Sequence, residues 1–187
     1  MSYLSRLLAL LFLIMPIAAS AGDARKLTMS LDDVFYVANI DDWKIDVERE
    51  LALRFADVHI TSKRGYPFGM MLYFKCDTPD LAQFDSPEKI ARSVRASSEK
   101  YLPNIVEKKI ILEPVSIRGS YGSLAVLTDA EVARKTSPAP GEFKYLTRGM
   151  IRLSRDSALG FSIMTNDISS ADYKRLLEYV YGFIKAP

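Results

Sequence analysis

The chain is poor in the residues from which catalytic and metal sites are most often built. Its 187 residues include one cysteine, Cys76, and one histidine, His59. A single cysteine excludes a disulfide within the chain, so the fold must be stabilised by packing alone. A single histidine excludes every site that needs two imidazoles from this chain, including the usual catalytic zinc sites. Cys76 ends an apolar stretch, and we expect it to be a small buried hydrophobe; a free thiol for intermolecular pairing is the alternative.

The chain also lacks an excess of charge of either sign. It has 25 basic and 23 acidic residues, and one basic residue, Arg6, lies in the N-terminal segment. A dedicated nucleic-acid-binding domain shows a basic excess, so this balance argues against nucleic acid as a partner. Beyond the first 21 residues no apolar run approaches the length of a membrane-spanning helix, and we expect no transmembrane anchor.

The first 21 residues have the layout of a secretory signal peptide. Arg6 gives a positive start, residues 7–14 form an unbroken apolar run, and Ala19-Ser20-Ala21 is the small-x-small pattern that signal peptidase recognises. Pro16 interrupts the run, which is too short to span a membrane. We expect cleavage after Ala21. Residues 22–187 would then form one soluble domain in a bacterial periplasm.

Most of the chain after the leader has the pattern of β-strands. Alternation of apolar and polar residues, or short apolar runs bounded by turn residues, predicts strands. A change of parity predicts a bulge near Ala56-Asp57, and a loop over 61–69 is expected to pair Ile60 with Met70 and His59 with Met71. Arg155-Asp156-Ser157 is expected to join the last two strands as a hairpin. The predicted strands are 34–37, 43–48, 51–60, 70–76, 108–113, 124–132, 143–153 and 159–165.

Two segments have the pattern of helices. Ser86-Pro87-Glu88 reads as an N-cap, a first-turn proline and a first-turn acid, and Pro103 ends this helix. Ser169 is predicted to cap a second helix, with Asp172 completing a capping box. Each helix has an apolar stripe that must be buried. The stripes are Ile90, Ala91, Val94, Ser98 and Tyr101 in the first helix, and Tyr173, Leu176, Leu177, Val180 and Ile184 in the second.

The order of elements is therefore strands, a helix, more strands and a final helix. Such segregation predicts an α+β fold, with a mostly antiparallel β-sheet flanked by two helices.

This order, the chain length, and an aromatic-rich strand leading through Ile40-Asp41-Asp42 into Trp43 resemble the PsbP-like superfamily, which includes DcrB-type bacterial envelope proteins. In that family the corresponding turn is commonly Pro-x-Gly-Trp. The resemblance covers roughly residues 34–184. It implies an α/β/α sandwich used mainly for binding other proteins, and it carries over no functional residues.

No arrangement of residues in the sequence predicts catalysis. In the expected register His59 and Cys76 lie five residues apart along the strands, about 16 Å, too far for a nucleophilic dyad. No Gly-x-Ser-x-Gly elbow or phosphate-binding loop is present. Asp32-Asp33 and Asp41-Asp42 are acidic pairs, of which the second is best interpreted as a turn. We therefore expect no catalytic residues, cofactor or metal.

Three surface segments are candidates for binding another protein. The loop at 61–69 combines Lys63 and Arg64 with Tyr66 and Phe68, residue types that anchor interfaces, although both aromatics could instead fold back onto the sheet edge. The proline-rich segment 134–142 would lose little entropy on binding, or could be a simple connector. A third candidate is a basic stripe that would meet an acidic partner or form a solvated sheet face. It comprises Lys144, Arg148 and Arg152, opposite in parity to Phe143, Tyr145, Ile151 and Leu153.

These features favour an exported, non-catalytic protein-binding domain. Its most concrete form is an inhibitor or immunity protein against a toxic effector that acts in the periplasm. One alternative is a DcrB-type envelope maintenance or assembly factor. Another is an enzyme of unfamiliar type that uses a carboxylate pair assembled by the fold.

Overall fold

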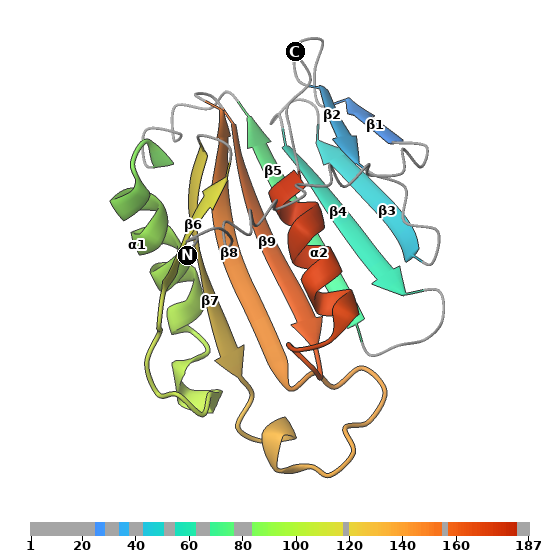
Figure 1. Ribbon diagram of the computed structural model, residues 1–187, viewed down its shortest axis with the longest axis vertical. Coiled ribbons are helices and arrows are strands. Elements are labelled where there is room, and N and C mark those ends of the chain that lie inside the picture. The colour runs from blue at the N-terminus through green and yellow to red at the C-terminus, as the bar shows by residue number, and fades with distance from the viewer. Residues whose placement is uncertain are drawn as a thin grey trace, which may run out of the picture.

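The computed structural model describes residues 25–28, 34–37, 43–50, 55–62, 68–76, 84–117, 120–154 and 157–182. Within these residues the fold is α+β, as the sequence predicts: a seven-stranded antiparallel sheet with a helix on each face (Figure 1). A separate two-stranded sheet pairs β1 (Arg25–Thr28) with β2 (Val34–Val37). The strand β1 was not predicted from the sequence.

The order of strands in the large sheet is β3-β4-β5-β9-β8-β7-β6, and every neighbouring pair is antiparallel. Strands that are far apart in the sequence therefore lie side by side near the centre of the sheet, where β5 pairs with β9. The strands are β3 (Trp43–Glu50), β4 (Phe55–Ser62), β5 (Phe68–Cys76), β6 (Glu113–Ile117), β7 (Ser120–Thr128), β8 (Tyr145–Ser154) and β9 (Ser157–Thr165).

The first helix, α1 (Pro87–Glu99), begins where the sequence predicts and ends at Glu99, before Tyr101 and the predicted stop at Pro103. The Ser86 side chain accepts a hydrogen bond from the Lys89 backbone N–H at 3.3 Å, which satisfies one of the free donors of the first turn. Ile90, Val94 and Ser98 face inward, and the helix packs on β7 and β8. A short 3-10 helix, η3 (Leu102–Asn104), follows at the predicted Pro103 break.

The second helix, α2 (Ala171–Gly182), lies on the other face of the sheet, against β9 (Figure 1). Its predicted cap is wrong by one residue. Ser170, not Ser169, accepts from the Tyr173 N–H, at 3.2 Å. Ser169 instead bonds through its N–H and hydroxyl to the carboxylate of Asp167, which forms the preceding turn.

Two hydrophobic clusters fill the space between the sheet and its helices. The cluster under α2 joins Tyr173, Leu176 and Val180 to apolar residues of five strands. The cluster under α1 joins Ile90 and Val94 to β7, β8 and β9. In β7, β8 and β9, residues of opposite parity enter opposite clusters, as the period of a strand requires.

Three strand predictions need correction. Pairing along β4 runs without interruption from Phe55 to Ser62 on the β3 edge and from Phe55 to Thr61 on the β5 edge, so no bulge lies at Ala56-Asp57. The strand predicted at 108–113 lies instead at Glu113–Ile117, because residues 105–112 form an irregular connection in which Lys108 has a positive φ of 53°. The strand predicted at 124–132 ends at Thr128, where Asp129 starts a turn.

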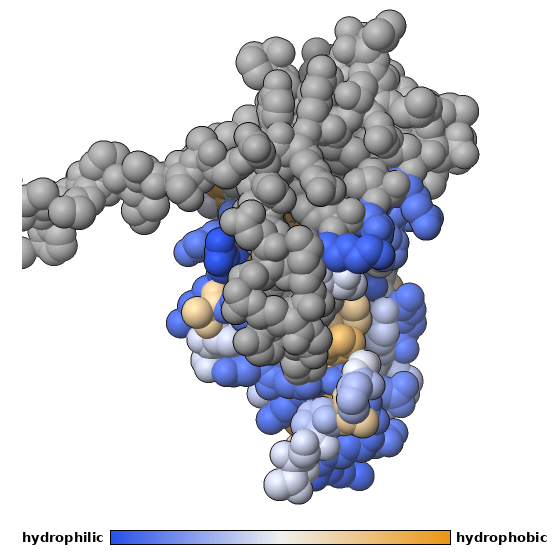
Figure 2. Space-filling model, turned by 90° about the vertical axis from the view of Figure 1, so that its right-hand side faces the viewer, coloured by the Kyte–Doolittle hydropathy of each residue, from blue (hydrophilic) through white to orange (hydrophobic). Residues whose placement is uncertain are grey.

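The pairing predicted across the 61–69 loop is confirmed, with Ile60 opposite Met70 and His59 opposite Met71. The hairpin predicted between the last two long strands is confirmed as β8 and β9. No helix among the described residues is long and apolar enough to cross a membrane. On the side of the molecule seen in Figure 2, the described surface is mostly hydrophilic, with small apolar patches between the charged groups.

Candidate functional site

The most developed surface feature among the described residues is the connection between β7 and β8, residues 129–144. It projects beyond the ends of the strands at the lower edge of the sheet (Figure 1). Asp129 begins it: one carboxylate oxygen accepts the backbone N–H groups of Glu131 and Val132, at 2.9 and 2.8 Å. This contact starts the short 3-10 helix η4 (Val132–Arg134).

The tip of this connection, residues 136–141, is braced from within. The Glu142 carboxylate bonds to the Lys135 ammonium group across the base of the tip and accepts a hydrogen bond from the Ala139 N–H within the tip, at 2.8 Å. The Glu142 N–H donates in return to the Ala139 carbonyl at 3.0 Å. Gly141 has a φ of 85°, a conformation that glycine adopts without strain. We call residues 136–141 the braced loop.

A second set of bonds ties the braced loop to the end of β9. The Asn166 side chain donates to the Glu142 carbonyl at 3.0 Å and accepts from the Lys144 N–H at 2.6 Å. The loop is therefore fixed to the sheet at its base as well as across its tip.

The ion pair between Lys135 and Glu142 also shifts the pKa of each group. The hydrogen bond from Lys135, followed by that from the Ala139 N–H, lowers the pKa of Glu142 below its ordinary value of 4.5. The same hydrogen bond raises the pKa of Lys135. At neutral pH both groups are charged and the brace is intact.

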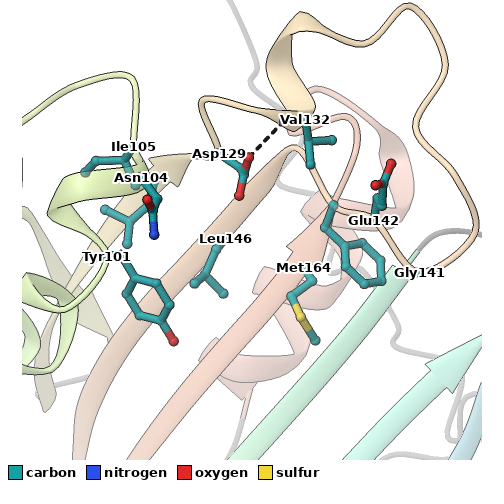
Figure 3. Close-up of a pocket in the computed structure, with 11 residues that line it drawn as sticks. Tyr101, Asn104, Ile105, Asp129, Val132, Gly141, Glu142, Leu146 and Met164 are labelled. Carbon is teal, nitrogen blue, oxygen red and sulfur yellow. Dashed lines mark hydrogen bonds between the residues drawn. The ribbon is translucent and has the colours of Figure 1, made fainter.

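A cavity of about 340 Å³ lies beside the braced loop, on the α1 side of the sheet (Figure 3). Its floor consists of apolar side chains from three adjacent strands, Leu127, Leu146 and Met164. Its walls are the segment after α1, with Tyr101 and Asn104, and the loop residues Glu142 and Phe143. A second hollow of about 480 Å³, lined by charged and polar groups that include Lys108 and Arg134, borders it at Asn104 and Asp129.

The predicted basic stripe lies on this same side of the sheet. Arg148 and Arg152 are half-buried, and each lies against a tyrosine. The guanidinium carbons are 5.6 Å from the Tyr101 ring centre and 5.9 Å from that of Tyr121. Each arginine also donates to the hydroxyl of its tyrosine, at 3.2 and 2.9 Å.

The third member of the stripe, Lys144, precedes β8, and its ammonium group is 5.2 Å from the Tyr145 ring centre. As predicted, Arg148 and Arg152 point to the opposite side of β8 from Ile151 and Leu153, which pack in the cluster under α2. The structure does not form one open basic stripe, because α1 and the segment after it cover the two arginines.

The other predicted binding residues divide between the described and undescribed parts of the chain. Lys63, Arg64 and Tyr66 lie outside the described residues, as do the acidic pairs at 32–33 and 41–42. Phe68 begins β5, opposite Thr165 of β9. The role in protein binding that the sequence predicts for these residues stays a prediction.

His59 and Cys76 are not brought together. His59 is exposed on β4 opposite Asp46 and Met71, and Cys76 ends β5 opposite Ser157. The five-residue offset separates them by about 16 Å along the sheet. Among the described residues no three His, Cys, Asp or Glu side chains form a group that could hold a metal ion.

Sequence reasoning singled out the segment 134–142 for its prolines but missed the cavity and the brace. Tyr101 was assigned to the apolar stripe of the first helix, and Glu142 and Asn166 gave no signal. Asp129 was the one detectable signal, since an aspartate after an apolar strand marks a turn.

The fold and site thus define an α+β domain with a braced surface loop and an adjoining cavity. In comparisons with known proteins, no family model and no curated protein matched the chain.

Proposed function

We propose that this chain is an exported, non-catalytic domain that binds another protein through the braced loop. In its most concrete form it is an inhibitor or immunity protein that inserts the loop into the cleft of an enzyme acting in the periplasm. The internal bracing of an exposed, convex segment is the observation that carries this proposal.

The bracing lowers the entropic cost of binding. A loop that is ordered only on association loses conformational freedom at that moment, and the lost entropy is subtracted from the affinity. Here Glu142 and Asn166 hold the backbone before any partner arrives. The two prolines, Pro138 and Pro140, restrict it further.

The surface of the tip suits a narrow cleft. Between Lys135 and Glu142 the loop carries no charged side chain, and its residues are small. Insertion into an enzyme cleft would therefore desolvate no ionic group of the tip. The charged pair at its base would remain at the rim, where ion pairs are tolerated.

The test is capture followed by inhibition. The full chain with a C-terminal tag is expressed in its own host, so that residues 1–21 direct its export, and is purified gently; co-purifying proteins are identified by mass spectrometry. Any enzyme recovered in stoichiometric amount is then assayed with and without the purified chain. The proposal requires both stoichiometric recovery and loss of that enzyme's activity.

Two exposed alanines provide a matched pair of variants. Ala139 lies at the tip of the braced loop and Ala96 on the outer side of α1. Ala139→Arg should weaken partner binding at least about tenfold, since it places a long charged side chain in the contact. Ala96→Arg should bind as the parent chain does.

Equal binding by both variants would remove the braced loop from the interface. Recovery of an enzyme that stays fully active, or of several envelope proteins in low yield, would contradict the inhibitor proposal. Tyr66→Ala in the same assay tests the interface residues predicted from the sequence.

A further inference from the structure

Arg148 makes few contacts for a half-buried cation. Its hydrogen bond to the Tyr101 hydroxyl and its contact with the Tyr101 ring are the interactions that the structure shows. Its Nε is buried without a hydrogen-bond partner. The ion pairs among the described residues do not include Arg148. Burial of a charged group is costly unless an opposite charge and hydrogen-bond acceptors accompany it. This arginine is therefore suited to an external anion.

The strand register places Arg148 next to the cavity floor. Ala125, Arg148 and Ser162 form one row across β7, β8 and β9. Leu127, Leu146 and Met164 form the next row on the same face, two residues away along each strand, or about 6.7 Å. A polar row with a cation thus borders the apolar floor of the cavity.

Tyr101 links the two rows. Its ring lines the cavity (Figure 3), and its hydroxyl oxygen accepts a hydrogen bond from Arg148. A phenol that accepts through oxygen still has its own proton to donate. Tyr101 lines the cavity, and Arg148, which lies outside its lining, is held against the Tyr101 hydroxyl one row beyond the floor, so both donors lie toward the same end.

The acidic groups of the cavity lie at its other end. Asp129 follows Leu127 by two residues, which places it two rows, about 13 Å, from the Arg148 row along the strand direction. Figure 3 shows one of its oxygens directed to the Val132 N–H. Glu142 is paired with Lys135. An anion would therefore be attracted to the Tyr101 end and repelled from the Asp129 end.

We propose that this cavity binds a carboxylate that carries an apolar body. The carboxylate accepts hydrogen bonds from Arg148 and from the Tyr101 hydroxyl. The apolar body lies on Leu127, Leu146 and Met164. The volume, about 340 Å³, is at the lower end of the range for small-molecule sites, and an apolar lining with a few polar groups is their usual composition. This site does not depend on the partner protein proposed above.

The first experiment is isothermal titration calorimetry of the full secreted chain with octanoate, 1-octanol and octylamine. Octanoate should bind, and at least about tenfold more tightly than either compound of the same chain length, since hydrogen bonds to a charged group supply that margin. Equal binding of octanol, tighter binding of octylamine, or no binding of any carboxylate tested would overturn the proposal.

Two arginine variants locate the site. Arg148→Gln should weaken octanoate binding at least about tenfold. Arg152→Gln is the matched control, because Arg152 is on the same strand and face, is stacked on a tyrosine in the same way, and lies four residues from Arg148 on the side away from the cavity floor. It should leave binding within about twofold. Equal effects of the two substitutions would refute the assignment.

Tyr101→Phe keeps the ring and removes only the hydroxyl group. It should weaken octanoate binding severalfold, with the fold checked by circular dichroism. Unchanged binding would remove the phenol from the site.

A peptide distinguishes the two sources of such a carboxylate. A hexapeptide ending in leucine is titrated as the free acid and as the C-terminal amide. Tighter binding of octanoate assigns the site to a free carboxylic acid. Tighter binding of the free-acid peptide, lost in Arg148→Gln and in the amide, assigns it to a chain terminus. If the amide binds as well as the acid, the carboxylate plays no part and the proposal fails.

Discussion

The two faces of the large sheet differ in what they bury. Under α2 the strands contribute Leu124, Ile151, Leu159, Phe161 and Ile163, all nearly inaccessible to water. Buried polar groups on this face have partners: the Thr147 and Tyr173 hydroxyls hydrogen-bond to each other at 2.8 Å, and the Thr165 hydroxyl donates to the Asp167 carbonyl at 3.3 Å. This face is built like the interior of a stable domain, with dense apolar packing and paired polar groups.

The face under α1 is apolar only in part. There the same strands place Arg148 and Arg152 against tyrosines and leave a cavity beside the braced loop. Further along this face, Asp46 and Glu48 of β3 and His59 of β4 are exposed. Dense packing stabilises a fold, whereas a cavity, or a charged group such as Arg148 whose Nε lacks a hydrogen-bond partner, lowers the stability of the fold. The packing therefore makes the α2 face the main source of stability, and the α1 face is where we propose that a ligand binds.

The largest expected effect on stability comes from shortening one apolar side chain on each face of the sheet to alanine. Ile163→Ala should lower the free energy of unfolding by about 2 to 5 kcal/mol, because Ile163 is fully buried under α2 and would leave a void. Leu146→Ala, in the half-buried cavity floor, should cost only about 1 to 2 kcal/mol. Urea denaturation with a common m-value measures both. Equal losses would show that the two faces do not differ.

Gly149→Ala tests the packing density of the α2 face. A Cβ at this position would lie 2.2 Å from Cζ of the Phe161 ring and 3.0 Å from the Cβ of Leu124. The ring must move, and we expect a loss of about 1 to 3 kcal/mol in thermal or urea unfolding. Adding Phe161→Leu should make the glycine substitution less costly than it is alone. Strict additivity of the two changes would contradict this explanation.

Tyr173→Phe tests the buried hydrogen bond between Thr147 and Tyr173 on that face. The substitution leaves the Thr147 hydroxyl buried without its partner, which should cost about 1 to 2 kcal/mol. Burial raises the pKa of Tyr173 above its ordinary value of 10.0, which indicates that the phenol is protonated at neutral pH. Thr147→Val in the same chain should recover part of the loss. A double-mutant cycle without coupling would show that the contact does not stabilise the fold.

The smallest effect on global stability is expected at the braced loop. Because the pKa of Glu142 is lowered in the folded state, its bonds are present above the ordinary carboxyl value of 4.5 and are lost as the pH falls through the lowered pKa. Hydrogen exchange of the Ala139 amide, corrected for its intrinsic pH dependence, should therefore become faster in acid. Glu142→Gln should show faster exchange already at neutral pH, with little change in the unfolding midpoint. Unchanged exchange in both conditions would mean that the brace does not order the loop.

Local patterns in the sequence correctly predicted those features, such as the start of α1 and the pairing across one loop, that are set by residues close together in the chain. Ser86 and Pro87 are sufficient to start α1, because a cap and a fixed φ act within one turn. The pairing of His59 with Met71 followed from the length of one loop. The cap of α2 was misassigned because Ser169 and Ser170 offer equivalent hydroxyl groups, and only the turn at Asp167 distinguishes them.

The candidate site was less predictable, since its parts come from distant segments. The brace needs Asn166 beside Glu142, and the cavity needs Tyr101 beside Leu146 and Met164. Arg148 and Arg152 were predicted to share a face, and they do. The strand period could not reveal that α1 would cover that face, because the period fixes only the side to which a residue points.

The sequence by itself determined the α+β class, both helices, the antiparallel pairing at the centre of the chain, and the alternation that sorts β8 into an apolar and a basic side. These features follow from local propensity and from periods of 2 and 3.6 residues. Only the tertiary structure decided that β5 lies beside β9, and that the basic side meets Tyr101 and the cavity. Such contacts depend on how helices and sheet pack to bury apolar area, which is a property of the whole chain and not of any segment.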